Sequence, residues 1–221
     1  MKRNLNKKTI VAIIGATGAT GKYVLEGALK RDFEVRVLAR TPSKLADIKN
    51  IDIVKGSVSD LEAVKKFVAG TDIVLSCLGT TKPPNYIVES GVTTILKAIQ
   101  AQETKPRFVQ MSAVGLGDSR PQCEKSWIWY LIVKLSFPMI GSELFADMER
   151  AENLMFAAKD VQSVVARAAI LTHKNAKGYK VQTAEEKVGK MLVSRRDIAA
   201  FMLDIVTDTK YDGKAVSLFS Q

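Results

Sequence analysis

Three glycines near the amino terminus have the spacing of a phosphate-binding turn. Gly15, Gly18 and Gly21 stand in IIGATGATGK, after an apolar run and at the start of a helical pattern. Gly15 allows a tight turn, Gly18 lets the backbone approach a pyrophosphate, and Gly21 lets the helix pack against the strand. Backbone amides from Thr17 to Thr20 would face the phosphates, where the helix dipole favours negative charge. Although the spacing is G-x-x-G-x-x-G rather than G-x-G-x-x-G, the strand-turn-helix context predicts a dinucleotide site.

The residues after the second strand-like run indicate whether the site prefers NAD(H) or NADP(H). That run ends at Arg40, about twenty residues beyond the glycine turn, where the residue that contacts the adenosine ribose is expected. An NAD site needs an acidic residue there, and no carboxylate lies between Arg36 and Ser43. The planar guanidinium of Arg40 can pair with a 2′-phosphate, and Lys44 can add a second charge. The sequence therefore predicts NADP(H) in preference to NAD(H).

Tyr130 and Lys134 form a possible acid-base pair in WIWYLIVK. Four residues apart on a helix, they share a face, and the lysine could lower the pKa of the phenol. Tyr130 follows Ser112 by 18 residues, which keeps this role open. However, the segment is apolar on nearly every face, and Pro138 must end or kink a helix there. We therefore judge Tyr130 and Lys134 unlikely as catalytic residues and favour an apolar pocket wall or lid, with a contact surface as a further alternative.

Strand-like runs alternate with helical patterns and would position these residues. Strands are expected at 9–15, 33–40, 51–56, 72–79 and 107–114, and helices at 19–32, 42–49, 59–70, 86–102 and 142–159. Ser59 is expected to cap the helix 59–70, and Gly70 to end it. This alternation predicts an α/β fold in which residues 1–221 form a single doubly wound Rossmann domain around a parallel β-sheet.

Composition narrows the function classes. The 221 residues include 47% hydrophobic and 25% charged residues, as in an ordinary globular protein. The net charge of +10 comes from scattered lysines and arginines, so we expect a basic surface and a phosphorylated cofactor, and no nucleic acid. The basic start is followed by a short strand-like run, which is unlike a signal peptide, and no apolar run is long enough to span a membrane. Two cysteines without metal or disulfide spacing predict no metal site and a cytoplasmic location.

The chain resembles the atypical short-chain dehydrogenases, in the NAD(P)-binding NmrA-like group, and within it the biliverdin and flavin reductases. The likeness covers nearly the whole chain and runs through IGATGATGK, FEVRVLARTPSKL, CLGTT, MSAVG and VSRRDIAAFMLDIVTDTKYDG. It implies a monomeric or loosely associated Rossmann protein that binds NADPH, with the nicotinamide open to a flat apolar substrate.

The resemblance also implies cofactor contacts along the chain. The matching residues are Gly15, Thr17, Gly18, Ala19, Thr20 and Gly21 in the phosphate turn; Arg40, Thr41 and Lys44 around the 2′-phosphate; Ser57 and Val58 beside the adenine; Leu78, Gly79 and Thr80 along the cofactor; and Ser112 and Arg167 near the nicotinamide end. Two positions depart from the group's pattern, because Ser57 stands where an aspartate is frequent and Ala168 where a proline is usual.

Other departures concern catalysis. Ile170 stands where the biliverdin and flavin reductases carry a histidine, and the chain's one histidine is His173. Leu144 and Met148 stand where the group's classical members place tyrosine and lysine. We therefore predict an NADPH-dependent reductase that transfers hydride to a flat aromatic acceptor (flavin-, quinone- or tetrapyrrole-like), with Ser112 as its candidate catalytic residue and the product protonated by solvent. The alternatives are a redox sensor that binds NADP(H) without turnover and, less favoured by the short chain, a sugar-nucleotide epimerase or dehydratase.

Overall fold

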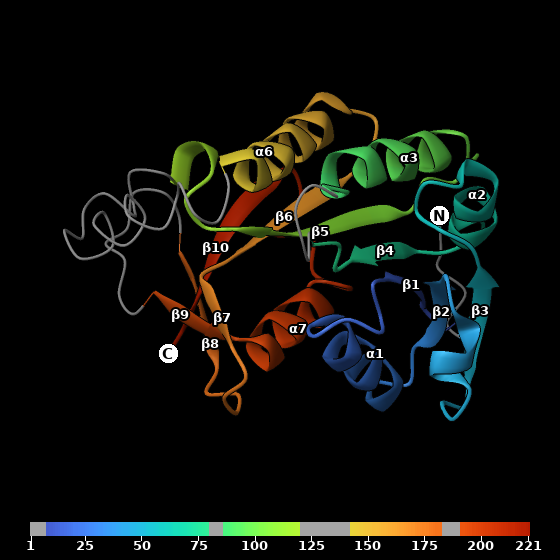
Figure 1. Ribbon diagram of the computed structural model, residues 1–221, viewed down its shortest axis with the longest axis horizontal. Helices are drawn as coiled ribbons and strands as arrows, with labels where there is room; N and C mark the ends of the chain where they lie inside the picture. The colour runs from blue at the N-terminus through green and yellow to red at the C-terminus, as the bar shows by residue number, and fades with distance from the viewer. Residues whose placement is uncertain (1–7, 80–85, 120–141, 183–190) are drawn as a thin grey trace.

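A parallel-stranded sheet organises the protein. The computed structural model describes residues 8–79, 86–119, 142–182 and 191–221. Within them, eight strands form one sheet in the order β3-β2-β1-β4-β5-β6-β10-β8 (Figure 1). The strands are β1 (Ile10–Ile14), β2 (Glu34–Ala39), β3 (Ile51–Lys55), β4 (Ile73–Ser76), β5 (Arg107–Ala113), β6 (Ser163–Ala168), β8 (Tyr179–Gln182) and β10 (Lys214–Ser220). Two further strands, β7 (Ile170–Thr172) and β9 (Leu192–Ser194), pair in a small separate sheet.

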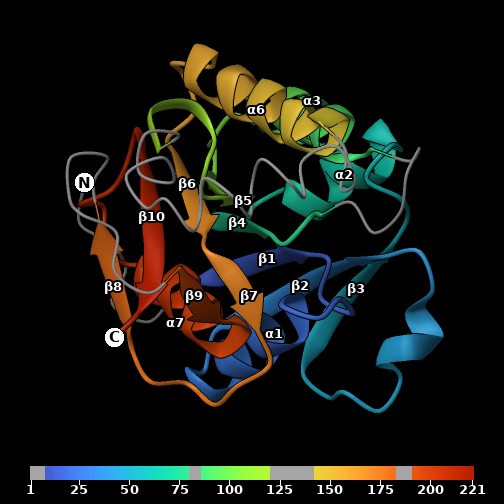
Figure 2. The same ribbon diagram turned by 60° about the vertical axis from the view of Figure 1, so that its left-hand side comes forward.

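Helices cover both faces of the large sheet. On one face lie α1 (Gly21–Lys30) and α7 (Arg195–Asp204), and on the other lie α2 (Leu61–Val68), α3 (Val88–Gln100) and α6 (Ser142–Ala157) (Figure 1). Figure 2 shows the same layers turned, with the strands β7 and β9 beside α7. Two 3-10 turns, η1 (Pro42–Leu45) and η2 (Gly117–Ser119), follow β2 and β5. The predicted doubly wound α/β fold is confirmed.

Burial on both faces explains why β1 is continuously apolar. Val11 and Ile13 belong to the core beneath α1 and α7, whereas Ala12 and Ile14 belong to the core beneath α2, α3 and α6. Each of these four side chains is at most 3% exposed. Successive residues of a strand point to opposite faces, so a strand covered on both sides needs apolar residues at every position.

The sheet departs from the prediction at one edge. β8 runs antiparallel to β10, with Ser217 opposite Gln182, whereas the pairings among β1 to β6 and between β6 and β10 are parallel. An antiparallel edge strand on an otherwise parallel sheet is common in doubly wound folds. The sheet is therefore mostly parallel, as predicted, with one antiparallel strand at its edge.

Two local expectations also need correction. The helix expected at 42–49 is a short 3-10 turn that ends at Leu45. Asp60, and not Ser59, caps α2, because its carboxylate accepts a hydrogen bond from the Ala63 amide at 3.1 Å. The hydroxyl of Ser59 instead bonds that of Ser57 at 3.0 Å. The predicted end of this helix is confirmed by the positive φ of 69° at Gly70.

No helix in the described ranges is long and apolar enough to cross a bilayer. The apolar run with Tyr130 and Lys134 lies outside the described residues, so its assignment as a pocket wall or lid stays a prediction.

Candidate cofactor and acceptor site

The carboxyl ends of strands β1 to β6 meet at one edge of the sheet, and the predicted site residues gather there. Arg40 follows β2, Ser57 follows β3, Gly79 follows β4, and Ser112 lies near the end of β5. Strand order reverses between β1 and β4, and in open α/β sheets a dinucleotide crosses the edge at that point. A dinucleotide bound in this way would have its adenosine half beyond β1 to β3 and its nicotinamide half beyond β4 to β6.

The turn after β1 has the close backbone packing that the glycine pattern predicts. The Gly18 amide donates to the Gly15 carbonyl at 2.8 Å. Gly15 has a φ of 79°, and a Cβ there would lie 3.0 Å from the carbonyl oxygen of Cys77. A Cβ on Gly21 would lie 2.0 Å from the Gly15 carbonyl oxygen, so this position admits no side chain. Thr17, Gly18 and Ala19 are exposed, which leaves the outer surface of the turn open.

The amino terminus of α1 is open to an anion, whereas those of α2, α3 and α7 are already capped by side chains of the protein. Asp60 caps α2, Ser194 caps α7, and Asp147 of α6 accepts from the first two amides of α3 at 3.0 and 3.1 Å. In α1 the Thr20 side chain makes no capping hydrogen bond, and the first turn holds no acidic residue. Free amides and the positive end of the helix dipole suit a pyrophosphate, so the turn fits the phosphates of a dinucleotide.

The two cations expected at the 2′-phosphate lie after β2. Arg40 and Lys44 are exposed, and neither forms an ion pair within the described ranges. The nearby Arg36, by contrast, pairs with Asp52 at 2.6 Å. Thr41 directly precedes η1, and its carbonyl accepts a hydrogen bond from the Lys44 amide at 3.2 Å. The guanidinium and ammonium groups therefore remain available to an anionic ligand.

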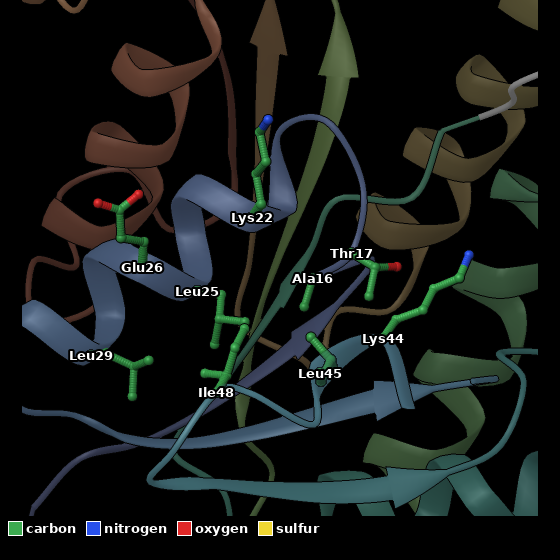
Figure 3. Close-up of a pocket in the computed structure, with 9 residues that line it drawn as sticks. All are labelled: Ala16, Thr17, Lys22, Leu25, Glu26, Leu29, Lys44, Leu45 and Ile48. Carbon is green, nitrogen blue, oxygen red and sulfur yellow. The ribbon is translucent and has the colours of Figure 1, made fainter. Parts of the chain in front are cut away.

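An apolar cavity of about 500 Å³ lies between α1 and the segment around η1 (Figure 3). It is lined by Ala16, Thr17, Lys22, Leu25, Glu26, Leu29, Lys44, Leu45 and Ile48. Thr17 of the phosphate turn and Lys44 lie together at one end of it. The cavity therefore lies on the side expected for the adenosine, and Ser112 is not part of its wall.

The loops after β3 and β4 are held against α3. A Cβ on Gly91 of α3 would lie 2.7 Å from Cδ1 of Leu78 and 3.2 Å from Cγ2 of Val58, so both side chains pack on this helix. Leu78 is buried, and Gly79 after it is partly buried. The predicted contact at Thr80 lies outside the described residues.

A buried charged network, which the sequence did not predict, lies at the ends of β5 and β6, where the nicotinamide is expected. The Ser112 hydroxyl donates to Oε1 of Glu152 at 2.6 Å. Arg167 donates to both carboxylate oxygens of Glu152 and also to Asp118 of η2. The Arg167 guanidinium therefore donates its hydrogen bonds to carboxylates of the protein. The structure shows no free N–H group of Arg167 directed at a cofactor, so the predicted cofactor contact gains no support here.

Four other side chains that bear on the predicted chemistry are apolar or uncharged. Leu144 and Met148 lie on α6, as the sequence register predicted. Ile170 follows β6 and is 46% exposed, which is unusual for a large apolar side chain. Burial raises the pKa of the Cys77 thiol to about 12, so this thiol is protonated at neutral pH and is a poor nucleophile. The described residues contain no group of three or more acidic, histidine or cysteine side chains that could hold a metal.

Comparisons with known proteins agree with this geometry. A family model described as NAD(P)H-binding matches residues 15–209 of the chain. The oxidoreductase dmxR7 of Cryptosporiopsis sp. is 24% identical over 227 residues, which cover 94% of this chain and 92% of that protein.

Solved structures share the fold at low sequence identity. The anaerobilin reductase ChuY of Escherichia coli O157:H7 has a TM-score of 0.77 at 17% identity, covering 96% of this chain and 97% of that chain. A short-chain dehydrogenase/reductase of Veillonella parvula, solved in complex with NADP, has a TM-score of 0.75 at 15% identity, covering 96% and 94%. At these identities the likeness establishes a Rossmann fold.

Proposed function

Because the chain belongs to the NAD(P)H-binding family, whose model spans residues 15–209, we propose that it is an NADPH-dependent reductase of a flat aromatic acceptor of the flavin, quinone or tetrapyrrole kind. Bound NADPH would supply a hydride, so the acceptor gains two electrons, NADP⁺ is left, and a solvent proton completes the product. The protein would contribute binding, orientation and an apolar surface.

The observation that carries the cofactor assignment is the uncapped amino terminus of α1 next to the unpaired Arg40 and Lys44. One feature suits the pyrophosphate and the other suits the 2′-phosphate. The names of the similar proteins, an oxidoreductase and an anaerobilin reductase, support reduction of a small molecule.

The side chains at the nicotinamide end support a stacked, apolar acceptor. Ile170 presents an exposed apolar surface after β6. Leu144 and Met148 replace the tyrosine and lysine of the classical dehydrogenases and cannot exchange protons. Hydride transfer to a flavin-like ring needs little acid catalysis from the protein, which suits such a site.

The test is NADPH oxidation measured with a panel of flavins, quinones and linear tetrapyrroles. Turnover of one or more of them would support the proposed reductase. Tight NADPH binding with no turnover of any acceptor would instead support a redox sensor, which the replacement of the acid-base pair by Leu144 and Met148 also permits.

Arg40→Ala should weaken NADPH binding by about 1.5–3 kcal/mol, the range for a hydrogen bond to a charged group. This corresponds to about a 10- to 150-fold higher Kd. NADH lacks the 2′-phosphate, so its affinity should change little. Calorimetric titration with both cofactors measures the difference, and Lys49→Ala, which removes another exposed cation, is the control. Equal affinities of the native protein for NADPH and NADH would contradict the assignment.

Tyr130→Phe should lower turnover less than about threefold, because we expect the ring and not the hydroxyl to matter. A general acid contributes about 10²- to 10⁴-fold to kcat, so the two roles are well separated. Lys134→Met should behave in the same way. A large loss of kcat in both variants, with folding and NADPH affinity intact, would restore the pair as the catalytic centre.

A further inference from the structure

The hydroxyl of Ser112 has one proton, and the surrounding contacts determine which group accepts its hydrogen bond. Ser112 lies at the end of β5, beside Arg167 of the neighbouring strand β6. Its oxygen is 2.6 Å from Oε1 of Glu152 on α6, and the two side chains belong to residues that are 7% and 3% exposed. A hydroxyl can donate one hydrogen bond and can accept others through its lone pairs.

Glu152 cannot be the donor in this contact. Arg167 donates to both of its oxygens, through Nε at 3.2 and 3.2 Å and through Nη2 at 2.7 Å. Although burial alone would lower the pKa of Arg167, hydrogen bonds and attraction to Glu152 and Asp118 raise it, so the guanidinium stays charged. A carboxylate that accepts a bidentate arginine is ionised and can only accept. The proton in the 2.6 Å contact is therefore the serine's.

We propose that Glu152, anchored by Arg167, is a positioning residue that holds the Ser112 hydroxyl as a hydrogen-bond acceptor toward the ligand. The proposal rests on the proposed function, since it concerns the acceptor that is reduced over the end of β5. A serine in this state can receive an N–H group of the acceptor. It cannot donate to a carbonyl oxygen, so it cannot stabilise the alkoxide that forms when hydride adds to a carbonyl carbon.

The consequence is a preference among acceptors. Where hydride reaches a nitrogen heterocycle, the negative charge spreads over the ring and water supplies the proton. Where hydride reaches a carbonyl carbon, the charge lies on one oxygen, and a missing donor there typically costs about 10²- to 10³-fold in rate. Glu152 would thus lower the rate of reduction of carbonyl acceptors, because it already accepts the one hydrogen bond that Ser112 can donate.

The test compares FMN with phenanthrenequinone as acceptors for three proteins. In Glu152→Met/Arg167→Met, two apolar side chains replace the ion pair, an exchange that is often neutral for stability. This variant frees the serine's proton and should raise the ratio of quinone to flavin turnover at least about tenfold. Adding Ser112→Ala to it should remove that gain. A general loss of structure would lower both activities together and cannot by itself raise the ratio, and circular dichroism checks that each variant is folded. An unchanged ratio in the folded double variant, or a gain that survives Ser112→Ala, would overturn the proposal.

A second measurement needs no turnover. In the native protein the Ser112 hydroxyl proton, buried and bound to a carboxylate, should exchange slowly with water and give a resolved proton resonance. Ser112→Ala identifies it by its loss, and Glu152→Met/Arg167→Met should also remove it. If the native protein reduces none of the flavins, quinones and linear tetrapyrroles of the panel, the proposed function fails while this resonance still tests the role of Glu152. Absence of a protected hydroxyl, or its persistence in the double variant, would show that Glu152 does not hold it.

Discussion

Gly18→Val should raise the Kd for NADPH at least about 100-fold, a loss of about 2.7 kcal/mol, while the protein still folds. Gly18 is exposed in the turn before α1, and its missing side chain lets the backbone approach a pyrophosphate. A Cβ at this position would contact only the Gly15 carbonyl oxygen, at 3.1 Å, which a small shift can relieve. Calorimetric titration with NADPH and chemical denaturation measure the two quantities.

Gly21→Ala is the matched control within the same turn. Its Cβ would lie 2.0 Å from the Gly15 carbonyl oxygen, so the backbone itself must move. We therefore expect this smaller substitution to lower the free energy of unfolding more than Gly18→Val does. A folded Gly18→Val protein with native affinity for NADPH would show that the pyrophosphate binds elsewhere.

Glu152→Ala should lower the free energy of unfolding by about 3–5 kcal/mol, the cost of removing one partner from a buried ion pair. It leaves the guanidinium of Arg167, a residue 4% exposed, with Asp118 as its remaining carboxylate partner at this site. It also removes the acceptor of the Ser112 hydroxyl. Denaturant titration followed by circular dichroism measures the change.

Two control variants separate the loss of the ion pair from other causes of a lower free energy of unfolding. Asn153→Ala, at the next and exposed position of α6, should change stability by no more than about 0.5 kcal/mol. Ser112→Ala keeps the ion pair and should cost about 1 kcal/mol, as expected for one hydrogen bond. A Glu152→Ala protein within about 1 kcal/mol of the native stability would contradict the buried pair.

Local patterns were enough to predict the strands from β1 to β5. Apolar runs with residues such as Val11 to Ile14 can only be buried on both faces, and the glycine turn fixes the first strand-helix junction. The later part of the chain was harder to predict from sequence. Strand β8 pairs with β10, which lies more than thirty residues further along the chain, and no local period specifies such a partner or its direction.

The nicotinamide end shows the same limit for side chains. Ser112 and Arg167 were singled out, but the group that joins them, Glu152, is 40 residues from the first and 15 from the second. A signal was present, since Arg167 interrupts an apolar strand and Glu152 lies between Met148 and Met155 on a helix. Charged residues are rarely buried unless they are paired, so opposite charges on the apolar faces of a strand and a helix indicate a buried ion pair. Only the packing of α6 on β6 establishes that the two residues face each other.

The place of β10 has a consequence for how the protein is made. Residues 214–220 lie between β6 and β8, and Leu218 and Phe219 are at most 2% exposed. These residues leave the ribosome after the other seven strands of the large sheet. Until then β6 keeps an open, apolar edge and β8 has no partner in the large sheet. Such edges pair readily with other chains. The large sheet of the nascent protein is therefore most open to misassociation before β10 is translated, and a stall at that point would prolong this exposure.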